Sequence, residues 1–166
     1  MSDKKQTHVE HEDVGLYQKL ADRTAEILEE GRKNIDGALK KASAEISAGG
    51  DYTREKAEKV GTYLRRDLTD FGKKAQQAGS TVINAVDPHR VAFGMQSSLA
   101  KLLKSTAGVL TEWAERSEHS LEFKTGEVTC PGTLSCKECG KEMHFKSTVK
   151  IPPCSECHKT LFRKSY

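Results

Sequence analysis

The sequence predicts an α+β protein in which long antiparallel helices, a helical hairpin plus a third helix, precede a small C-terminal β module. Three observations support this fold class. Apolar residues recur at helical spacing from Tyr17 to Trp113. From Gly126 onward cysteines, glycines and prolines replace that spacing. Two Cys-x-x-Cys pairs lie in this last segment. The segment is too short and too poor in apolar residues to form a large core.

The first segment, residues 1–12, is predicted to be a disordered tail because it is polar and has no periodicity. It has no apolar segment of the kind found in a signal peptide. The chain also has no run of about 18 apolar residues that would span a bilayer. We therefore expect a cytoplasmic protein with no membrane partner. Thiols stay reduced in that compartment, where paired Cys-x-x-Cys motifs hold metal more often than they form disulfides.

Residues 13–122 are predicted to form a helical, coiled-coil-like region. Small and apolar residues in its first helix alternate at spacings of four and three, as in a coiled-coil seam: Tyr17, Ala21, Thr24, Leu28, Gly31, Ile35, Ala38 and Ala42. Gly49-Gly50 is predicted to end this helix. Thr53 is the predicted N-cap of a second helix, with Glu55 in its first turn. The short connection between the two favours an antiparallel hairpin.

The second helix has a clear apolar face, consisting of Ala57, Val60, Leu64, Leu68, Phe71 and Ala75. The pattern does not fix its end, because Gly79-Ser80 can break it. Asp87-Pro88 predicts the start of a third helix that runs to about Ser117. Its apolar face consists of Met95, Leu99, Leu102, Val109, Leu110 and Trp113. We interpret these faces as intramolecular core rather than as a partner-binding groove. Self-association through the helices is the alternative.

Residues 123–166 are predicted to form the β module. Apolar and polar residues alternate between Glu142 and Ile151, which is typical of a strand pair with one covered face. Ser147-Thr148 is predicted to hold the turn of this pair. The module has too few apolar residues to be stable by packing alone, so it needs a cross-link or a metal ion.

The cysteine pairs supply such a metal site. Cys136-Lys-Glu-Cys139 and Cys154-Ser-Glu-Cys157 are separated by fourteen residues, a pattern typical of a zinc ribbon. The two-residue spacer lets a tight turn direct both thiolates to one ion, with Zn–S bonds of about 2.3 Å. We predict one structural Zn²⁺ bound by Cys136, Cys139, Cys154 and Cys157. Four thiolates close the tetrahedral shell, so a catalytic zinc is disfavoured, as is a redox pair.

Three nearby residues are not predicted to be ligands. Cys130 is interpreted as a spare thiol, with an alternative ligand or a redox-sensitive residue as the other readings. His144 lies on the polar side of the alternation. His158 occupies the position that Gly140 has in the first Cys-x-x-Cys turn, where the backbone is left-handed, and histidine tolerates this conformation better than most residues.

Charge and missing motifs restrict the function. Residues 126–166 carry seven Lys or Arg against four Glu, a net charge of +3, and the zinc–thiolate centre reduces this to about +1. The chain contains no P-loop, dinucleotide-binding fingerprint, HExxH or nucleophile elbow, so we do not expect an enzyme. We expect a protein-interaction adaptor or regulator. The alternative is weak nucleic-acid binding by basic residues interleaved with aromatic ones: Lys146, Lys150, Lys159, Arg163 and Lys164 with Phe145, Phe162 and Tyr166.

Several short motifs together resemble the uncharacterised bacterial zinc-ribbon proteins typified by YbeL. They are Arg65-Arg66-Asp67-Leu68, Glu112-Trp113, Gly126-Glu127-Val128, Gly132-Thr133-Leu134, the two cysteine pairs and Leu161-Phe162-Arg163. The resemblance covers nearly the whole chain and implies helices followed by a C-terminal ribbon. His158, in place of the usual glycine, and the additional Cys130 depart from the family pattern. The family has no established activity, so the resemblance implies an architecture and not a function.

Overall fold

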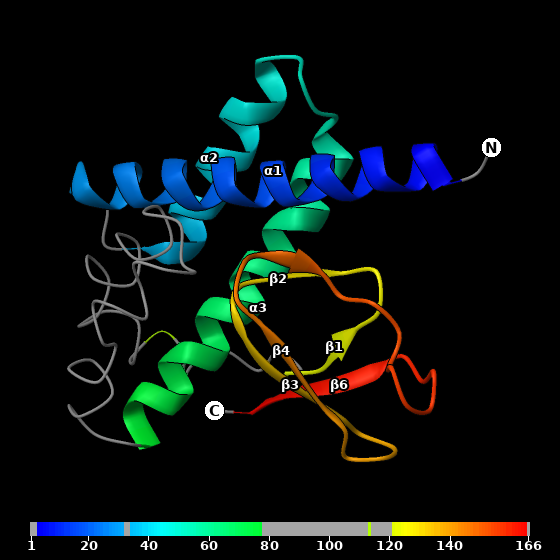
Figure 1. The fold of residues 1–166 in the computed structure, drawn as a ribbon. Helices are drawn as coiled ribbons and strands as arrows, with labels where there is room; N and C mark the ends of the chain where they lie inside the picture. The colour runs from blue at the N-terminus through cyan, green and yellow to red at the C-terminus, as the bar shows by residue number, and fades with distance from the viewer. Residues whose placement is uncertain (1–2, 32–33, 78–112, 114–120, 166) are drawn as a thin grey trace.

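The computed structural model describes residues 3–31, 34–77, 113 and 121–165. Its described elements are helices followed by strands (Figure 1): α1 (Asp3–Glu29), α2 (Ile35–Ala48), α3 (Arg54–Gln77), β1 (Phe123–Lys124), β2 (Val128–Thr129), β3 (Gly132–Cys136), β4 (Glu142–Phe145), β5 (Val149–Lys150) and β6 (Leu161–Ser165). The α+β class with a C-terminal strand region is therefore confirmed. None of the described helices is long and apolar enough to cross a membrane.

The first predicted helix is in fact two helices. α1 ends at Glu29, and Gly31 then adopts a left-handed backbone with φ +106°. Asn34 caps α2, because its side chain accepts a hydrogen bond from the backbone N–H of Gly37. The seam in the sequence continues through Gly31, whereas a glycine with positive φ commonly ends a helix. The prediction of one helix from Tyr17 to Ala42 is corrected accordingly.

The N-terminus also differs from the prediction of a disordered tail over residues 1–12, since α1 begins at Asp3. The segment lacks an apolar face, but Lys, Gln and Glu are good helix formers. Adding residues to an existing helix costs far less than nucleating one, so a polar extension can follow the packed part of α1.

α2 and α3 form the predicted antiparallel hairpin, with α1 lying across it (Figure 1). Gly49 and Gly50 follow the last residue of α2, as predicted. The Thr53 hydroxyl accepts a hydrogen bond from the backbone N–H of Lys56 at 3.3 Å, which confirms Thr53 as the N-cap of α3. α3 ends at Gln77, before Gly79-Ser80. The third helix predicted from Asp87 lies outside the described residues, except for Trp113, which is helical.

The strands form two small antiparallel sheets. The order in the larger sheet is β1-β6-β3-β4, and the smaller sheet pairs β2 with β5. The alternation of β4 is confirmed, because Met143 and Phe145 are half-buried while Glu142 and His144 are exposed. The hairpin predicted over residues 142–151 is wrong, because β4 pairs with β3 and β5 pairs with β2. Periodicity shows which face of a strand is covered but not which strand lies beside it.

Two apolar cores lie side by side. The ribbon, residues 123–165, has a core of Phe123, Leu134, Cys136, Ile151, Cys154 and Phe162. The helical core consists of Leu16, Tyr17, Leu20, Ala21, Ala25, Ile27, Ile35, Ala38, Leu39, Ala42, Val60, Leu64, Leu68 and also Val128 from β2. Cys130 packs against the helical core as well. The ribbon therefore contributes residues to the core of the helices.

Candidate metal centre

Each Cys-x-x-Cys pair lies in a turn with the same backbone hydrogen bonds. In the first turn, the Cys136 N–H donates to the Lys141 carbonyl at 2.9 Å and the Gly140 N–H donates to the Cys136 carbonyl at 3.0 Å. The second turn repeats both bonds at 3.0 Å, from Cys154 N–H to the Lys159 carbonyl and from His158 N–H to the Cys154 carbonyl. The two turns are therefore equivalent, as their spacing predicts.

In each turn, the residue after the second cysteine has a left-handed backbone, as the sequence predicts. Gly140 has φ +74° and His158 has φ +57°. Both values lie near the left-handed helical region, which histidine populates more readily than branched residues. His158 therefore shapes the second turn through its backbone, and its exposed side chain is not part of the cysteine cluster.

Backbone amides in both turns point at the sulfurs. The N–H groups of Cys139 and Glu138 donate to Cys136 Sγ, and those of Cys157 and Glu156 donate to Cys154 Sγ. The Lys141 and Lys159 N–H groups donate to the other two sulfurs, Cys139 Sγ and Cys157 Sγ. Each sulfur thus lies in a site built to stabilise a thiolate.

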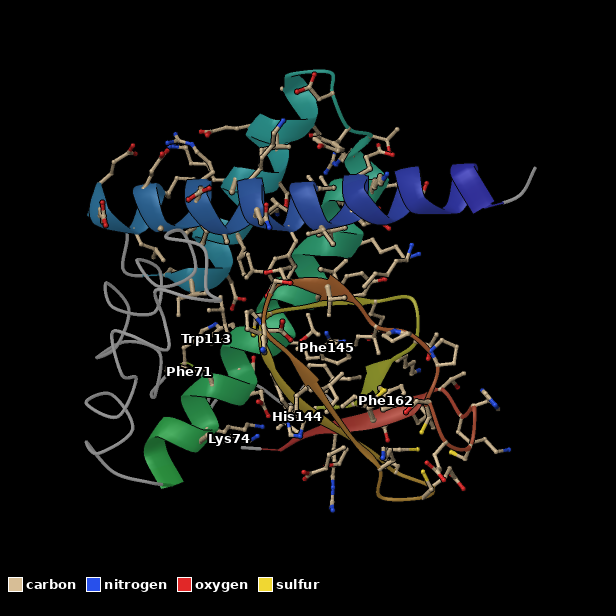
Figure 2. All side chains as sticks on the ribbon, viewed as in Figure 1. Phe71, Lys74, Trp113, His144, Phe145 and Phe162 are labelled. Atoms are coloured by element: carbon tan, nitrogen blue, oxygen red, sulfur yellow. The ribbon has the colours of Figure 1, made fainter. Side chains whose placement is uncertain are left out.

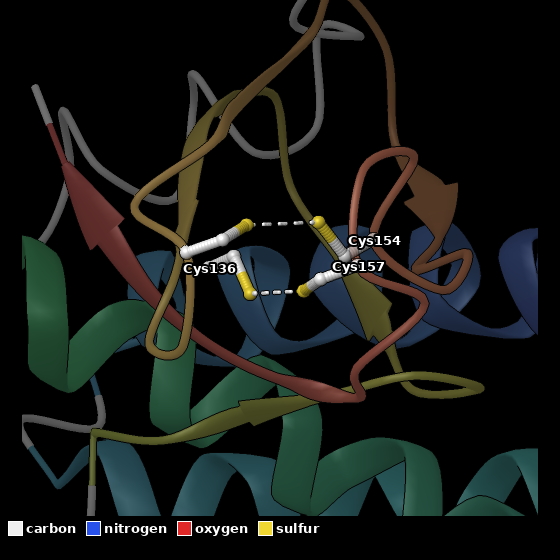
Figure 3. Close-up of side chains that lie close together, drawn as sticks. Cys136, Cys154 and Cys157 are labelled. Carbon is white, nitrogen blue, oxygen red and sulfur yellow. Dashed lines mark hydrogen bonds between the residues drawn. The ribbon is translucent and has the colours of Figure 1, made fainter.

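The turns bring the four sulfurs together. All four Sγ atoms of Cys136, Cys139, Cys154 and Cys157 lie within 4.8 Å of one another, and we call this group the sulfur cluster. Cys136 Sγ is 3.5 Å from Cys157 Sγ, and Cys139 Sγ is 3.6 Å from Cys154 Sγ (Figure 3). Bonds of about 2.3 Å to a tetrahedral zinc ion place sulfurs about 3.8 Å apart, so the cluster fits that ion.

The thiol pKa values show why the sulfur cluster suits a cation. Amides of Cys157 and Glu156 lower the pKa of Cys154 to about 6. The Lys159 amide also lowers the pKa of Cys157, but burial and the three neighbouring thiols outweigh it and raise that pKa to about 12. Like charges at these distances oppose complete ionisation, whereas a divalent cation stabilises all the thiolates at once.

No other group of three or more His, Cys, Asp or Glu side chains in the described part of the chain is placed to hold a metal ion. His144 is exposed, and its Nδ1 is 2.8 Å from Thr133 Oγ1 in a hydrogen bond across β3 and β4. Figure 2 shows His144 among the strands, with Phe145 and Phe162. His144 and His158 are therefore outside the metal centre, as predicted.

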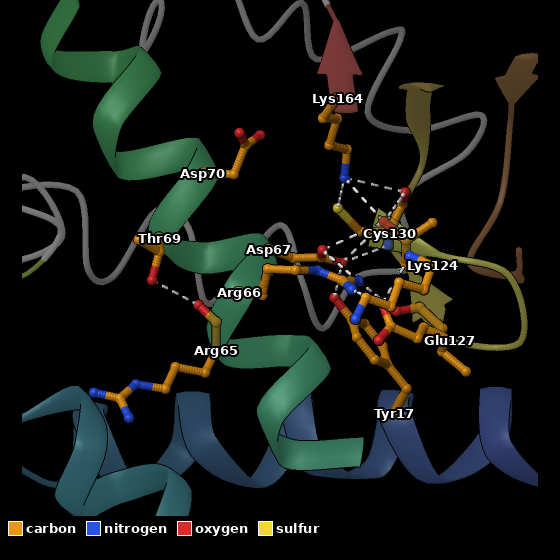
Figure 4. A network of polar contacts seen from close by, with 12 residues as sticks. Tyr17, Arg65, Arg66, Asp67, Thr69, Asp70, Lys124, Glu127, Cys130 and Lys164 are labelled. Atoms are coloured by element: carbon orange, nitrogen blue, oxygen red, sulfur yellow. Dashed lines mark hydrogen bonds and ion pairs between the residues drawn. The ribbon is translucent and has the colours of Figure 1, made fainter. Parts of the chain in front are cut away.

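The sequence analysis missed a buried polar cluster between the helices and the ribbon. We call it the Asp67 network: Tyr17, Arg66, Asp67, Thr129, Cys130 and Lys164. The Asp67 carboxylate accepts hydrogen bonds from the Tyr17 hydroxyl at 2.7 Å and the Cys130 N–H at 2.8 Å (Figure 4). Burial raises the pKa of Asp67, but nearby Lys164 and Arg66 outweigh it, so this pKa is lower than that of an ordinary aspartate.

Arg66 and Lys164 supply the positive charge of the Asp67 network. Arg66 pairs with both Asp67 and Glu127, donates to the Val128 carbonyl at 3.1 Å and lies 3.9 Å above the Phe123 ring. Lys164 Nζ donates to the Thr129 hydroxyl at 3.2 Å. Both cations are buried. The residues next to them in the sequence do not indicate this. The Arg65-Arg66-Asp67-Leu68 motif is the one sequence signal at this position, and by itself it indicates family membership but not burial.

The family described as zinc-ribbon containing domain matches residues 22–165, which include both cysteine pairs and the Asp67 network except Tyr17. The chain belongs to this family. Its relatives include the uncharacterised protein YbeL of Escherichia coli strain K12, which is 22% identical over 89% of this chain and 92% of YbeL. YbeL of strain O157:H7 matches to the same extent. No solved structure matches the chain.

Family membership confirms the resemblance that the sequence motifs indicate. It also agrees with the fold, since the described elements are helices followed by strands that carry a four-cysteine cluster. The family is a zinc-ribbon family by description, and the four sulfurs are arranged to bind a metal ion. The relatives have no described activity, so function has to be argued from this chain's own residues.

Proposed function

We propose that this chain is a non-enzymatic cytoplasmic zinc protein in which one structural Zn²⁺, bound by the sulfur cluster, holds the ribbon in shape for interaction with a protein partner. The observation that carries the proposal is the closed set of four sulfur donors. Four thiolates complete a tetrahedral shell and leave no position for a reacting water or substrate. The ion's contribution is therefore to folding, about 10–16 kcal/mol in comparable small modules.

Metal content tests the zinc part of the proposal. Protein purified without chelator should contain one zinc per chain, and cobalt substitution should give the intense charge-transfer bands of a four-thiolate site. Cys136→Ser and Cys157→Ser should lose the metal, and Cys130→Ser should keep it. Zinc near zero in the wild type, a cobalt spectrum that requires nitrogen ligands, or equal loss in all three variants would refute the assignment.

A groove between α2 and α3 supports the choice of a protein partner. It has a volume of about 570 Å³ and is lined by Asp36, Leu39, Lys40, Ser43, Ala44, Arg54, Glu58, Gly61, Thr62 and Arg65. Charges of both signs surround small and apolar side chains, which suits the mixed surface of a protein better than a row of phosphates. Asp36 and Arg65 also contact Trp113, through a 2.9 Å hydrogen bond from the indole and a cation–π contact, respectively.

Nucleic-acid binding is the second candidate. Two of the basic residues that the sequence suggests for it are not available to bind phosphate. Lys164 is buried in the Asp67 network, and Lys150 forms an ion pair with Asp13 at 3.0 Å. Lys146, Lys159 and Arg163 are exposed. Phosphate-dominated binding needs several cations on one face, and a zinc–thiolate centre adds negative charge beside them. We therefore propose at most weak, sequence-independent contact with nucleic acid.

Capture experiments with matched variants distinguish the two candidates. Ala44 and Ala48 are both exposed on α2, but only Ala44 lines the groove. The zinc-loaded chain should capture a protein from native lysate in the presence of nuclease. Ala44→Trp, which fills the groove, should lose that protein, and Ala48→Trp should retain it. Capture that disappears with nuclease, or equal capture by both variants, would refute the groove as the adaptor surface.

Direct titration tests the second candidate by itself. Zinc-loaded protein is titrated with DNA and RNA oligonucleotides at two salt concentrations. We expect non-specific Kd values no tighter than about 10⁻⁶ M at physiological salt. Submicromolar affinity that is abolished by Lys159→Glu and Arg163→Glu would favour nucleic acid over a protein partner.

A further inference from the structure

Cys130 and Lys164 face each other in the Asp67 network, between the helices and the ribbon, and neither belongs to the sulfur cluster. Lys164 is only 7% exposed, and its Nζ lies 2.7 Å from Cys130 Sγ (Figure 4). The Thr129 hydroxyl and the Cys130 carbonyl hold the same ammonium group, at 3.2 Å and 3.4 Å. A Cβ atom on Gly132 would lie 2.9 Å from Lys164 Cε, so glycine there gives the lysine room to reach the sulfur.

The contact between Cys130 and Lys164 is not needed to bind the metal ion or to balance the charge of Asp67. Cys130 is outside the sulfur cluster, which is complete without it. The charge of Lys164 is matched by Asp67, whose proximity raises the lysine pKa against the effect of burial. Sulfur is larger than oxygen, so 2.7 Å is short for an N–H···S hydrogen bond, since N–H···O bonds average about 2.9–3.0 Å. The distance is too long for a direct N–S bond and is close to what one oxygen atom bonded to both would hold.

We propose that Cys130 and Lys164 form a reversible oxidative cross-link in which one oxygen atom, supplied by dioxygen, joins Cys130 Sγ to Lys164 Nζ. The thiol and the amine, or equally the thiolate and the ammonium, carry three hydrogens between them. One S–O and one N–O bond form as the O–O bond breaks. The second oxygen leaves as water with two of those hydrogens, and the third stays on nitrogen. Sulfur and nitrogen each give up two electrons, and dioxygen accepts all four.

The surroundings of the pair favour this product over other oxidation products. Cys130 is half-buried, so a small oxidant can reach its sulfur more easily than a second protein or a bulky thiol. The lysine nitrogen is already in place, because hydrogen bonds to Thr129 and Cys130 hold it there.

The cross-link would enclose the metal centre covalently. Cys130 precedes β3 and Lys164 lies in β6, so the closed loop contains Cys136, Cys139, Cys154 and Cys157. Closing a loop removes conformations from the unfolded chain and thereby stabilises the fold. The oxidised ribbon should therefore keep more of its structure than the reduced ribbon after the zinc is removed. The redox state of this pair would set how strongly the fold depends on metal.

Peptide mapping of the zinc-loaded full chain tests the proposal. Protein incubated with ¹⁸O-labelled dioxygen is denatured, alkylated, digested and compared with an anaerobic sample. We expect a linked pair of peptides containing Cys130 and Lys164, with two hydrogens lost and one ¹⁸O gained. The anaerobic sample and a sample reduced with dithiothreitol should lack it. Complete alkylation of Cys130, a disulfide to another cysteine, a link without oxygen, or oxygen from water would overturn the proposal.

Variants provide the control for specificity. Lys164→Arg keeps the positive charge beside Asp67 but removes the amine, and Cys130→Ser removes the sulfur, so neither should form the link. Lys159→Arg changes an exposed lysine on the same ribbon and should form as much as the wild type. The wild-type peptide map decides the question even if a variant folds poorly. A linked pair in Cys130→Ser with the same mass change, two hydrogens lost and one oxygen gained, would show that the assignment is wrong.

Discussion

Asp67 is a buried carboxylate that depends on partners from several elements. It is 3% exposed and accepts hydrogen bonds from Tyr17, Thr129 and Cys130 while two cations lie nearby. Removing one partner of a buried charge cluster leaves the other charges without compensation, which is far more costly than losing an exposed ion pair. Asp67 therefore joins α1, α3 and the ribbon at one carboxylate.

We predict that Asp67→Asn lowers the free energy of unfolding by about 3–5 kcal/mol, because Arg66 and Lys164 lose their buried counter-charge. Urea unfolding of zinc-loaded protein measures this. Glu58→Gln is the control, since its 2.8 Å ion pair with Arg54 is exposed and should contribute less than about 1 kcal/mol. A loss below about 1 kcal/mol for Asp67→Asn would show that the buried charges do not depend on Asp67.

The same residue predicts an acid dependence. The folded pKa of Asp67 lies below the unfolded value, so its contribution to stability is complete above about pH 4 and is lost as pH falls through the folded pKa. The wild type should therefore lose more stability than Asp67→Asn as pH falls below about 4. Zinc content measured at each pH in both proteins separates this effect from acid release of zinc, because the two proteins share the same metal centre. Equal acid sensitivity in the presence and absence of Asp67 would contradict the low pKa.

The left-handed residues of the metal turns give a second prediction at this scale. Gly140→Ala should destabilise the zinc-loaded ribbon by about 1–2 kcal/mol, because φ +74° is costly for alanine. His158→Gly should not destabilise it, since glycine adopts φ +57° without strain. Competition with a zinc chelator measures both variants against the wild type. Loss of affinity in His158→Gly equal to that in Gly140→Ala would mean that the histidine side chain has a role of its own.

The break between α1 and α2 depends on a cap. Asn34 accepts the Gly37 N–H at 3.2 Å and so satisfies one free amide of the first turn of α2. Asn34→Ala should cost about 1 kcal/mol, and Asn34→Asp should cost little because a carboxylate accepts the same bond. Thermal unfolding followed by circular dichroism measures the difference. Equal stability of the two variants would show that the cap is not needed.

How far the sequence predicts an element depends on whether its signal is local. Thr53, Gly49-Gly50 and the positions of both cysteine turns were predicted because the residues that determine them are adjacent in the chain. Gly31 and Asn34 were equally local signals, but the seam through Tyr17 and Ile35 is compatible with one helix or two. The pairing of β4 with β3 instead of β5 could not be predicted, because strand partners are chosen by distant contacts.

The Asp67 network could not be predicted from the chain for the same reason. Its members come from α1, α3, β2 and β6, and nothing in their sequence neighbourhoods distinguishes a buried lysine from an exposed one. Lys164 follows Arg163 directly, yet Arg163 is exposed and Lys164 is buried, as alternation on a strand requires. The sequence predicts the four sulfur ligands as a group, but it includes Lys164 in the basic patch of the alternative, nucleic-acid reading.

At the scale of the whole molecule, the question is whether the helices fold without the ribbon. The helical region carries its own apolar seam, which on the sequence alone predicts that removing zinc unfolds the ribbon and spares the helices. The structure predicts the opposite. Val128 of the ribbon lies in the helical core, and its carbonyl accepts a hydrogen bond from Arg66 of α3. Tyr17 of α1 donates to Asp67, which also binds the ribbon. Lys74 Nζ of α3 donates to the Lys164 carbonyl at 2.8 Å. Losing the ribbon would expose these polar groups and part of the core.

We therefore predict that chelating the zinc perturbs helices and ribbon together. Trp113, the single tryptophan, bonds to Asp36 on α2 and is separate from the sulfur cluster, so its fluorescence reports on the helices. A chelator titration should change tryptophan emission and far-ultraviolet circular dichroism with the same midpoint as zinc release, and added zinc should reverse all three. The physical reason is that zinc binding, about 10–16 kcal/mol in small modules, stabilises the ribbon strands that cover Asp67. Zinc release with unchanged helicity and emission would instead mean that the buried network is not needed to hold the helices.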